Sequence, residues 1–203
     1  LGCLPLIAEQ LMLDRLEAAK AFVRANKLDR TVFGGANKKL GIVTSGKAYL
    51  DVMDALSQLD INEAAAQRLG IAVYKVAMVW PLEPEGLKKF AGDCDILLVI
   101  EEKRAVIEDQ IAALLINLND DVRPVLIGKF DTDGAVLIPM GGELSPSVIA
   151  QQLARQILQS VDDEALRAAL VRLQDSCKTQ QGLAPGQSDL ARIPSFCAGC
   201  PHN

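Results

Sequence analysis

Long apolar runs are absent from this sequence. None reaches the roughly 18 residues that a membrane-spanning helix needs, and no basic-then-apolar leader precedes a small-residue cleavage site. The chain has 203 residues, half of them hydrophobic, which is enough to build a sizeable core. We therefore expect a soluble, cytoplasmic protein with no membrane partner.

Clustered positive charge is also absent. The formal net charge is -5, from 21 Lys and Arg against 26 Asp and Glu, and the two signs are interspersed along the chain. Proteins that bind nucleic acid attract its phosphate backbone with a concentrated positive field. We therefore expect no nucleic-acid partner.

The cysteines lack the pattern of a disulfide framework. They are odd in number and irregularly spaced, which favours reduced thiols. Only the last two have the spacing of metal ligands. The five are Cys3, Cys94, Cys177, Cys197 and Cys200.

What is present is a regular alternation of apolar patterns. Helical periodicity predicts helices at residues 6–25, 45–59, 84–90, 104–118, 146–159 and 161–173. Apolar and β-branched runs predict strands at residues 31–33, 40–44, 71–79, 96–100 and 124–128. The alternation predicts an α/β fold with a mostly parallel sheet that is covered on both faces.

Two strands have more specific predictions. The turn at Gly34 and Gly35 suggests that residues 31–33 and 40–44 form a hairpin. The run at residues 96–100 is apolar throughout, as a central parallel strand buried on both faces requires.

Residues 41–48 (GIVTSGKA) are one residue short of a phosphate-binding loop. Ala48 has no hydroxyl for a metal ion, and Ile42 and Val43 have the character of a strand interior. These mismatches favour a strand–turn–helix connection over nucleotide hydrolysis. The turn would lie at the carboxyl edge of the sheet, where open α/β sheets bind ligands, so contact with a partner domain or a cofactor stays open.

Glu101 and Glu102 follow the buried strand at residues 96–100. Adjacent carboxylates can act as a general base and its neighbour, because like charges raise one pKa. They can also be solvated charges, anions at the start of a helix, or part of an interface.

Cys197 and Cys200 are separated by Ala and Gly and followed by Pro and His202. Two thiolates at this spacing can bind one iron or zinc ion from a tight loop, but a complete site needs about four ligands. The pair is therefore either two reduced thiols or part of a metal site completed outside this chain.

Four stretches together resemble one family. They are residues 41–51 (GIVTSGKAYLD), 74–84 (YKVAMVWPLEP), 99–104 (VIEEKR) and 196–202 (FCAGCPH). In this order they resemble the indolepyruvate:ferredoxin oxidoreductases, and most closely the long fused form found in bacteria. This family belongs to the thiamine-diphosphate-dependent 2-oxoacid:ferredoxin oxidoreductase superfamily.

The resemblance implies a domain arrangement. Residues 1–30 would be an N-terminal amphipathic helix and connector, and residues 31–160 a transketolase C-terminal-like domain. That domain is a three-layer α/β/α sandwich with a mixed, mostly parallel five-stranded sheet whose first strand is antiparallel. Residues 161–195 would be a helix and linker, and residues 196–203 the start of a thiamine-diphosphate-binding domain. Leu1 and Asn203 do not have the character of natural termini, so we expect a piece of a larger enzyme.

The resemblance also implies roles for the C-terminal motif. Cys197 and Cys200 correspond to ligands of an iron–sulfur cluster near the thiamine, and His202 corresponds to a cofactor contact. Ala198 departs from the Pro that is common between these cysteines, and the other ligands would lie beyond Asn203.

The larger enzyme would convert indolepyruvate, or another aryl or branched 2-oxoacid, to acyl-CoA. It would use thiamine diphosphate with magnesium, an iron–sulfur cluster, coenzyme A and ferredoxin. The chain itself would be inactive and cofactor-free, docking the thiamine-binding domains and building a homodimer. The alternative from another class is a self-contained nucleotide-binding or regulatory α/β module.

Overall fold

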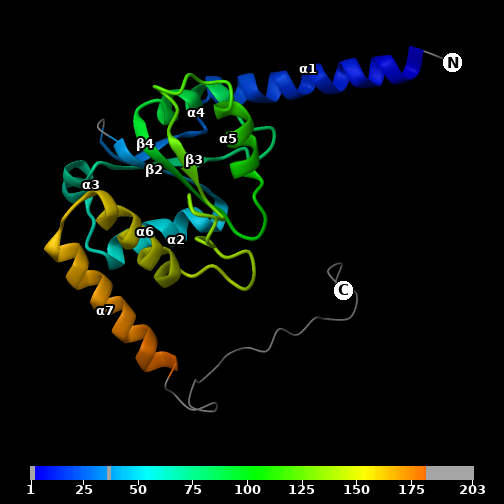
Figure 1. The fold of residues 1–203 in the computed structure, drawn as a ribbon. Helices are drawn as coiled ribbons and strands as arrows, with labels where there is room; N and C mark the ends of the chain where they lie inside the picture. The colour runs from blue at the N-terminus through cyan, green and yellow to red at the C-terminus, as the bar shows by residue number, and fades with distance from the viewer. Residues whose placement is uncertain (1–2, 36–37, 182–203) are drawn as a thin grey trace, which may run out of the picture.

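The computed structural model describes residues 3–35 and 38–181. Five strands form one sheet in the order β1-β3-β2-β4-β5 (Figure 1). The strands are β1 (Arg30–Gly34), β2 (Lys38–Ser45), β3 (Ile71–Val76), β4 (Cys94–Ile100) and β5 (Val125–Ile127). The helices are α1 (Cys3–Ala25), α2 (Gly46–Gln58), α3 (Glu63–Leu69), α4 (Pro84–Ala91), α5 (Ile107–Leu115), α6 (Pro146–Ser160) and α7 (Glu164–Gln181).

The sheet is mixed, as predicted. β2 pairs in parallel with β3 on one side and with β4 on the other, and β4 pairs in parallel with β5. β1 runs antiparallel to its neighbour. The predicted five-stranded mixed sheet with an antiparallel first strand is therefore confirmed.

The predicted hairpin is wrong. β1 pairs with β3, with Gly34 opposite Ala72, and not with β2. Both edges of β2 are already occupied by β3 and β4, so β1 can join the sheet only outside β3. Gly34 has φ +90, and a Cβ there would lie 2.0 Å from the carbonyl oxygen of Ile71. A glycine is required for this close approach.

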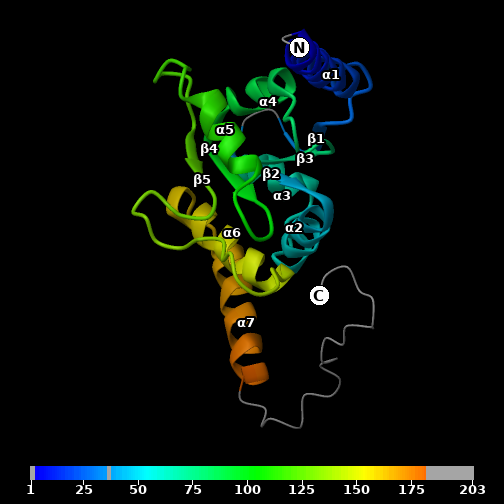
Figure 2. The same ribbon diagram turned by 90° about the vertical axis from the view of Figure 1, so that its right-hand side faces the viewer.

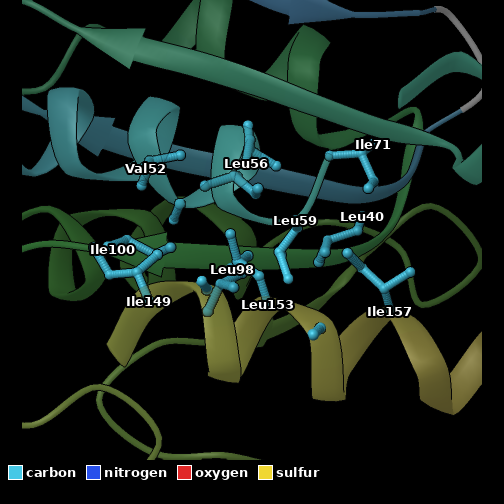
Figure 3. Packing of buried hydrophobic residues seen from close by; sticks show 14 of the residues in the cluster. Leu40, Val52, Leu56, Leu59, Ile71, Leu98, Ile100, Ile149, Leu153 and Ile157 are labelled. Atoms are coloured by element: carbon cyan, nitrogen blue, oxygen red, sulfur yellow. The ribbon is translucent and has the colours of Figure 1, made fainter. Parts of the chain in front are cut away.

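Helices cover both faces of the sheet (Figures 1 and 2), and buried apolar side chains fill the space between the sheet and the helices on each face. Alternate residues of a strand point to opposite faces, so Ile42 of β2 joins one cluster of buried side chains and Val43 joins the other. The first cluster packs under α2, α3, α6 and α7, and the second under α4 and α5. Figure 3 shows Leu98 and Ile100 of β4 facing the α6 side chains of the first cluster.

The sequence analysis predicted residues 96–100 as the central strand, but the middle strand of the sheet is β2. Those residues belong to β4, which is an interior strand between β2 and β5. Both strands are buried on both faces, so burial alone could not rank them.

Element ends differ from the predictions at several places. α3 was missed because it has only seven residues; Asn62 caps it, accepting a hydrogen bond from the Ala65 amide at 3.0 Å. α5 spans residues 107–115 rather than 104–118, and β3 ends at Val76. The helix predicted at 161–173 continues to Gln181, and the rest of the predicted linker lies outside the described residues.

Within the part of the chain that the structure describes, none of the helices combines the length and the apolar character needed to cross a bilayer. α7 packs on α6 rather than standing apart, since Leu166 and Ala169 are buried in the first cluster. The helix that follows residue 160 therefore belongs to the same core as the sheet.

Replacing Leu98 by Ala tests the packing of β4. The side chain is fully buried against the helices, so its removal should lower the free energy of unfolding by about 2 to 5 kcal/mol. Urea denaturation of the chain measures this. Val136→Ala, at an exposed side chain, is the control and should change it by less than about 0.5 kcal/mol. A Leu98→Ala loss as small as the control's would place β4 at an exposed edge.

Candidate functional site

A cleft of about 480 Å³ lies at the carboxyl edge of the sheet. It lies where β2 and β4 end and where the loop after β3 passes, so it brings together three of the four stretches that carry the family resemblance. Parallel strands of open α/β sheets place ligands and partners at this edge. The lining residues are Ser45, Gly46, Lys47, Ala48, Val79, Glu101, Glu102, Lys103, Arg104 and Val106.

Lys47 in the first turn of α2 joins three parts of this edge. Its ammonium group lies 3.0 Å from the Asp51 carboxylate, 3.2 Å from Glu102 and 3.3 Å from Glu143. It also donates to the Leu144 carbonyl at 3.0 Å. The hydrogen bond to Asp51, with those to Glu102 and Glu143, raises the pKa of Lys47. Its charge is thus balanced by carboxylates of the domain itself.

The turn at residues 41–48 is the predicted strand–turn–helix connection. β2 continues to Ser45, and Ile42 and Val43 are fully buried within it. Gly46 has φ +53, a left-handed conformation that glycine adopts without strain, at the start of α2. The residues that would form a phosphate-binding loop are therefore strand interior, as the mismatches indicated.

Glu101 is an anion at the start of a helix. It is buried, and its carboxylate accepts hydrogen bonds from the amides of Val106 at 3.0 Å, Ile107 at 3.0 Å and Glu108 at 3.0 Å. These amides begin α5 and have no partner within the helix. With its oxygens occupied in this way, Glu101 is a structural cap rather than a general base.

Lys129 lies beneath the cleft and was missed by the sequence analysis. Its side chain is only 2% exposed, and its ammonium group donates to the Glu101 carbonyl. Its own amide donates to the Glu108 carboxylate at 2.9 Å. Burial lowers the pKa of Lys129 and raises the pKa of Glu108. A single lysine after a short strand carries no sequence signal of burial.

Val79 of the loop after β3 and Val106 at the start of α5 line the cleft, and with Trp80, which follows Val79, they form what we call the apolar rim. Gln110 of α5 fixes this loop, donating to the carbonyls of Val79 at 2.9 Å and Val106 at 2.8 Å and accepting from the Leu82 amide at 2.9 Å. The side chains of Val79, Trp80 and Val106 remain 37%, 61% and 44% exposed. The Trp80–Pro81 peptide bond is cis.

Glu83 ends the same loop and links α1 to α4. Its carboxylate accepts from the amides of Glu85 at 3.0 Å and Gly86 at 2.8 Å, which start α4. It also pairs with Arg24 of α1 at 2.8 Å. Burial by itself would raise the pKa of Glu83, but these amides and Arg24 outweigh it, so the pKa is lowered.

Metal-binding side chains do not gather in the described part of the chain. In residues 3–35 and 38–181, no three His, Cys, Asp or Glu side chains are arranged to hold a metal ion. Burial raises the pKa of the Cys94 thiol to about 12, so it stays protonated. Cys197, Cys200 and His202, the predicted ligands and cofactor contact, lie outside the described residues.

Comparison with known proteins decides the family. The model of the indolepyruvate oxidoreductase domain matches residues 30–180, well over half of the chain. The chain belongs to this family. The resemblance that the sequence motifs indicated is therefore confirmed.

The curated relatives of this indolepyruvate oxidoreductase domain are much longer proteins. Indolepyruvate oxidoreductase subunit IorA of Methanothermobacter thermautotrophicus is 23% identical over 202 residues, which cover 97% of this chain and 26% of that protein. The IorA subunit of Pyrococcus horikoshii is 23% identical over 176 residues, covering 83% and 22%. The chain thus spans about a quarter of the length of these relatives.

Solved structures give more distant likenesses. A 2-oxoglutarate:ferredoxin oxidoreductase from Magnetococcus marinus matches 64% of this chain and 19% of its own, with 16% identity and a TM-score of 0.44. A split-gene transketolase matches 70% of this chain and 42% of its own, with 17% identity and a TM-score of 0.39.

Replacing Glu101 by Ala tests its role as a cap. The change leaves the amides that begin α5 without their acceptor in a buried place, so the free energy of unfolding should fall by about 2 to 4 kcal/mol. Chemical denaturation followed by circular dichroism measures the loss. Glu102→Ala is the matched control next to it, and it should leave stability nearly unchanged because its ion pair with Lys47 is partly exposed to solvent. Equal losses for the two variants would contradict the assignment.

Proposed function

We propose that this chain is the docking domain of a 2-oxoacid:ferredoxin oxidoreductase. The substrate would be indolepyruvate or another aryl or branched 2-oxoacid, the acyl acceptor coenzyme A and the electron acceptor ferredoxin. The family match over residues 30–180 supports the parent activity. The length of the relatives supports further domains beside this one.

One observation carries the docking role. The carboxylates that line the cleft are used within the domain, with Glu101 capping α5 and Glu102 paired to Lys47. What the cleft offers outward is the apolar rim of Val79, Trp80 and Val106, together with the cations Lys103 and Arg104. Exposed aromatic and aliphatic side chains beside an arginine are typical of protein–protein contacts. The rim therefore suits contact with the neighbouring thiamine-binding domains.

The chemistry of the parent would then be carried outside the described residues. Thiamine diphosphate with magnesium supplies carbanion stabilisation when it is bound. Cys197 and Cys200 are our candidates for ligands of an iron–sulfur cluster through which electrons reach ferredoxin, and His202 for a contact to the cofactor. Residues 196–203 would open the thiamine-diphosphate-binding domain. We further propose that the enzyme works in the cytoplasm as a homodimer.

A comparison of this chain with the intact enzyme tests the proposal. Calorimetry should detect no binding of magnesium and thiamine diphosphate to the chain, and elemental analysis should find no stoichiometric iron in it. The intact enzyme should retain both. The difference is expected because a metal site needs ligands that are already ordered and complete.

Two controls sharpen this comparison. In the intact enzyme, joint Cys197→Ser and Cys200→Ser replacement should remove iron and ferredoxin reduction while thiamine diphosphate still binds. The same double replacement in the 203-residue chain should leave the melting temperature of the chain unchanged. A thiamine site in the chain, or wild-type iron in the doubly substituted enzyme, would contradict the proposal. A nucleotide that raises the chain's melting temperature would favour the regulatory-module alternative.

A further inference from the structure

Asp29 lies between α1 and β1 and extends the pairing of β1 with β3 beyond its last backbone pair. That pair joins Arg30 of β1 to Lys75 of β3. Just past it, the Asp29 carboxylate accepts hydrogen bonds from the amides of Ala77 at 2.7 Å and Met78 at 3.3 Å. The loop after β3 therefore leaves the sheet with its first two residues held by the segment that follows α1.

Arg24 in the last turn of α1 holds the other end of the same loop. Its guanidinium lies 2.8 Å from the carboxylate of Glu83, a side chain that caps α4 and is only 2% exposed. It also lies 3.1 Å from the Glu85 carboxylate. Because Arg24 and Asp29 belong to one short connection, residues 24–29, both ends of the loop are tied to the same piece of backbone.

The connection between α1 and β1 is itself fixed. Lys27 has φ +50, the left-handed conformation that ends many helices, and the Leu28 amide donates back to the Val23 carbonyl at 3.1 Å. Of the α1 side chains that the structure describes, those of residues 9–25, only Val23 is buried. The helix projects from the body of the domain in Figure 1. α1 is therefore attached at its C-terminal end, next to the residues that hold the loop.

The middle of the loop is held separately, from the core side. Gln110 of α5 bonds the carbonyl of Val79 and the amide of Leu82. The loop is thus anchored in the middle by α5 and at both ends by the connection that follows α1. A contact loop that is fixed at its ends and its middle loses less entropy when it meets a partner.

We propose that residues 24–29 position the loop part of the apolar rim for docking, with Arg24 and Asp29 as the positioning residues. A displacement of α1 would then be transmitted to Val79 and Trp80, because the helix and both ends of the loop share one fixed connection. This inference rests on the docking role proposed above and adds what sets the shape of the docking surface.

Two variants of the 203-residue chain test the coupling. Arg24→Ala and Asp29→Ala each release one end of the loop. Neither removes the 2.9 Å hydrogen bond from the Leu82 amide to Gln110. Exchange of the Leu82 amide should still become about tenfold faster in each variant, because loosening the ends of a loop makes local opening of its middle easier. Trp80 is the only tryptophan of the chain, so its fluorescence anisotropy should fall in both variants.

Two further substitutions separate positioning from a general loss of stability. Arg68→Ala breaks an ion pair of the same kind, between an arginine and the buried Asp163 carboxylate, away from the loop. It should lower the melting temperature but leave exchange at Leu82 unchanged. Asp29→Asn keeps the oxygen that accepts from Ala77, so exchange at Leu82 should stay within about twofold of wild type.

In the intact enzyme, Arg24→Ala and Asp29→Ala should weaken the slowing of exchange that docking gives to the rim. Wild-type exchange at Leu82 in both variants of the chain would overturn the inference. So would an equal effect of Arg68→Ala, or full protection of the rim in both variants of the intact enzyme. The docking proposal fails separately, if the wild-type rim exchanges equally in the chain and in the intact enzyme.

Discussion

The end of β4 is held by one buried carboxylate and one buried ammonium group, and the carboxyl edge of the sheet depends on them. The Glu101 carboxylate accepts hydrogen bonds from the amides that begin α5, while the Lys129 ammonium group donates to the carbonyl of Glu101. The backbone amide of Lys129 donates a hydrogen bond to the Glu108 carboxylate in the first turn of α5. These hydrogen bonds join the end of β4, the start of α5 and the segment after β5. Each of the buried charged groups would be costly to bury without such partners.

Three of the charged side chains that line the cleft, Lys47, Glu101 and Glu102, are used within the domain. Lys47 ties α2 to Glu102 and to the loop at Glu143, so these side chains fix the geometry of the edge. The apolar rim at Val79 and Trp80 is held in place by Gln110. Fixing the backbone of a contact loop in advance lowers the entropy lost on association.

Periodicity and turn chemistry predicted most of the fold, and their failures have physical causes. Ser145 and Pro146 marked the start of α6, because a capping hydroxyl and a proline at the first turn are local signals. The pairing of β1 was wrong because strand order depends on which edges are already filled, and that is decided by distant segments. At the site, the role of Glu101 was among the alternatives considered from sequence. The burial of Lys129 was not, because it arises only when β4 and the segment after β5 meet.

Hydrogen exchange at the apolar rim tests most directly whether this domain docks through its carboxyl edge. The amides of residues 79–80 and 102–105 would be compared between the 203-residue chain and the intact enzyme, with residues 117–123 at the opposite edge as the internal control. Docking predicts slower exchange at the rim in the intact enzyme, and little change at the control segment. Equal exchange at the rim in both proteins would contradict the docking account, because a covered edge cannot remain as accessible as a free one.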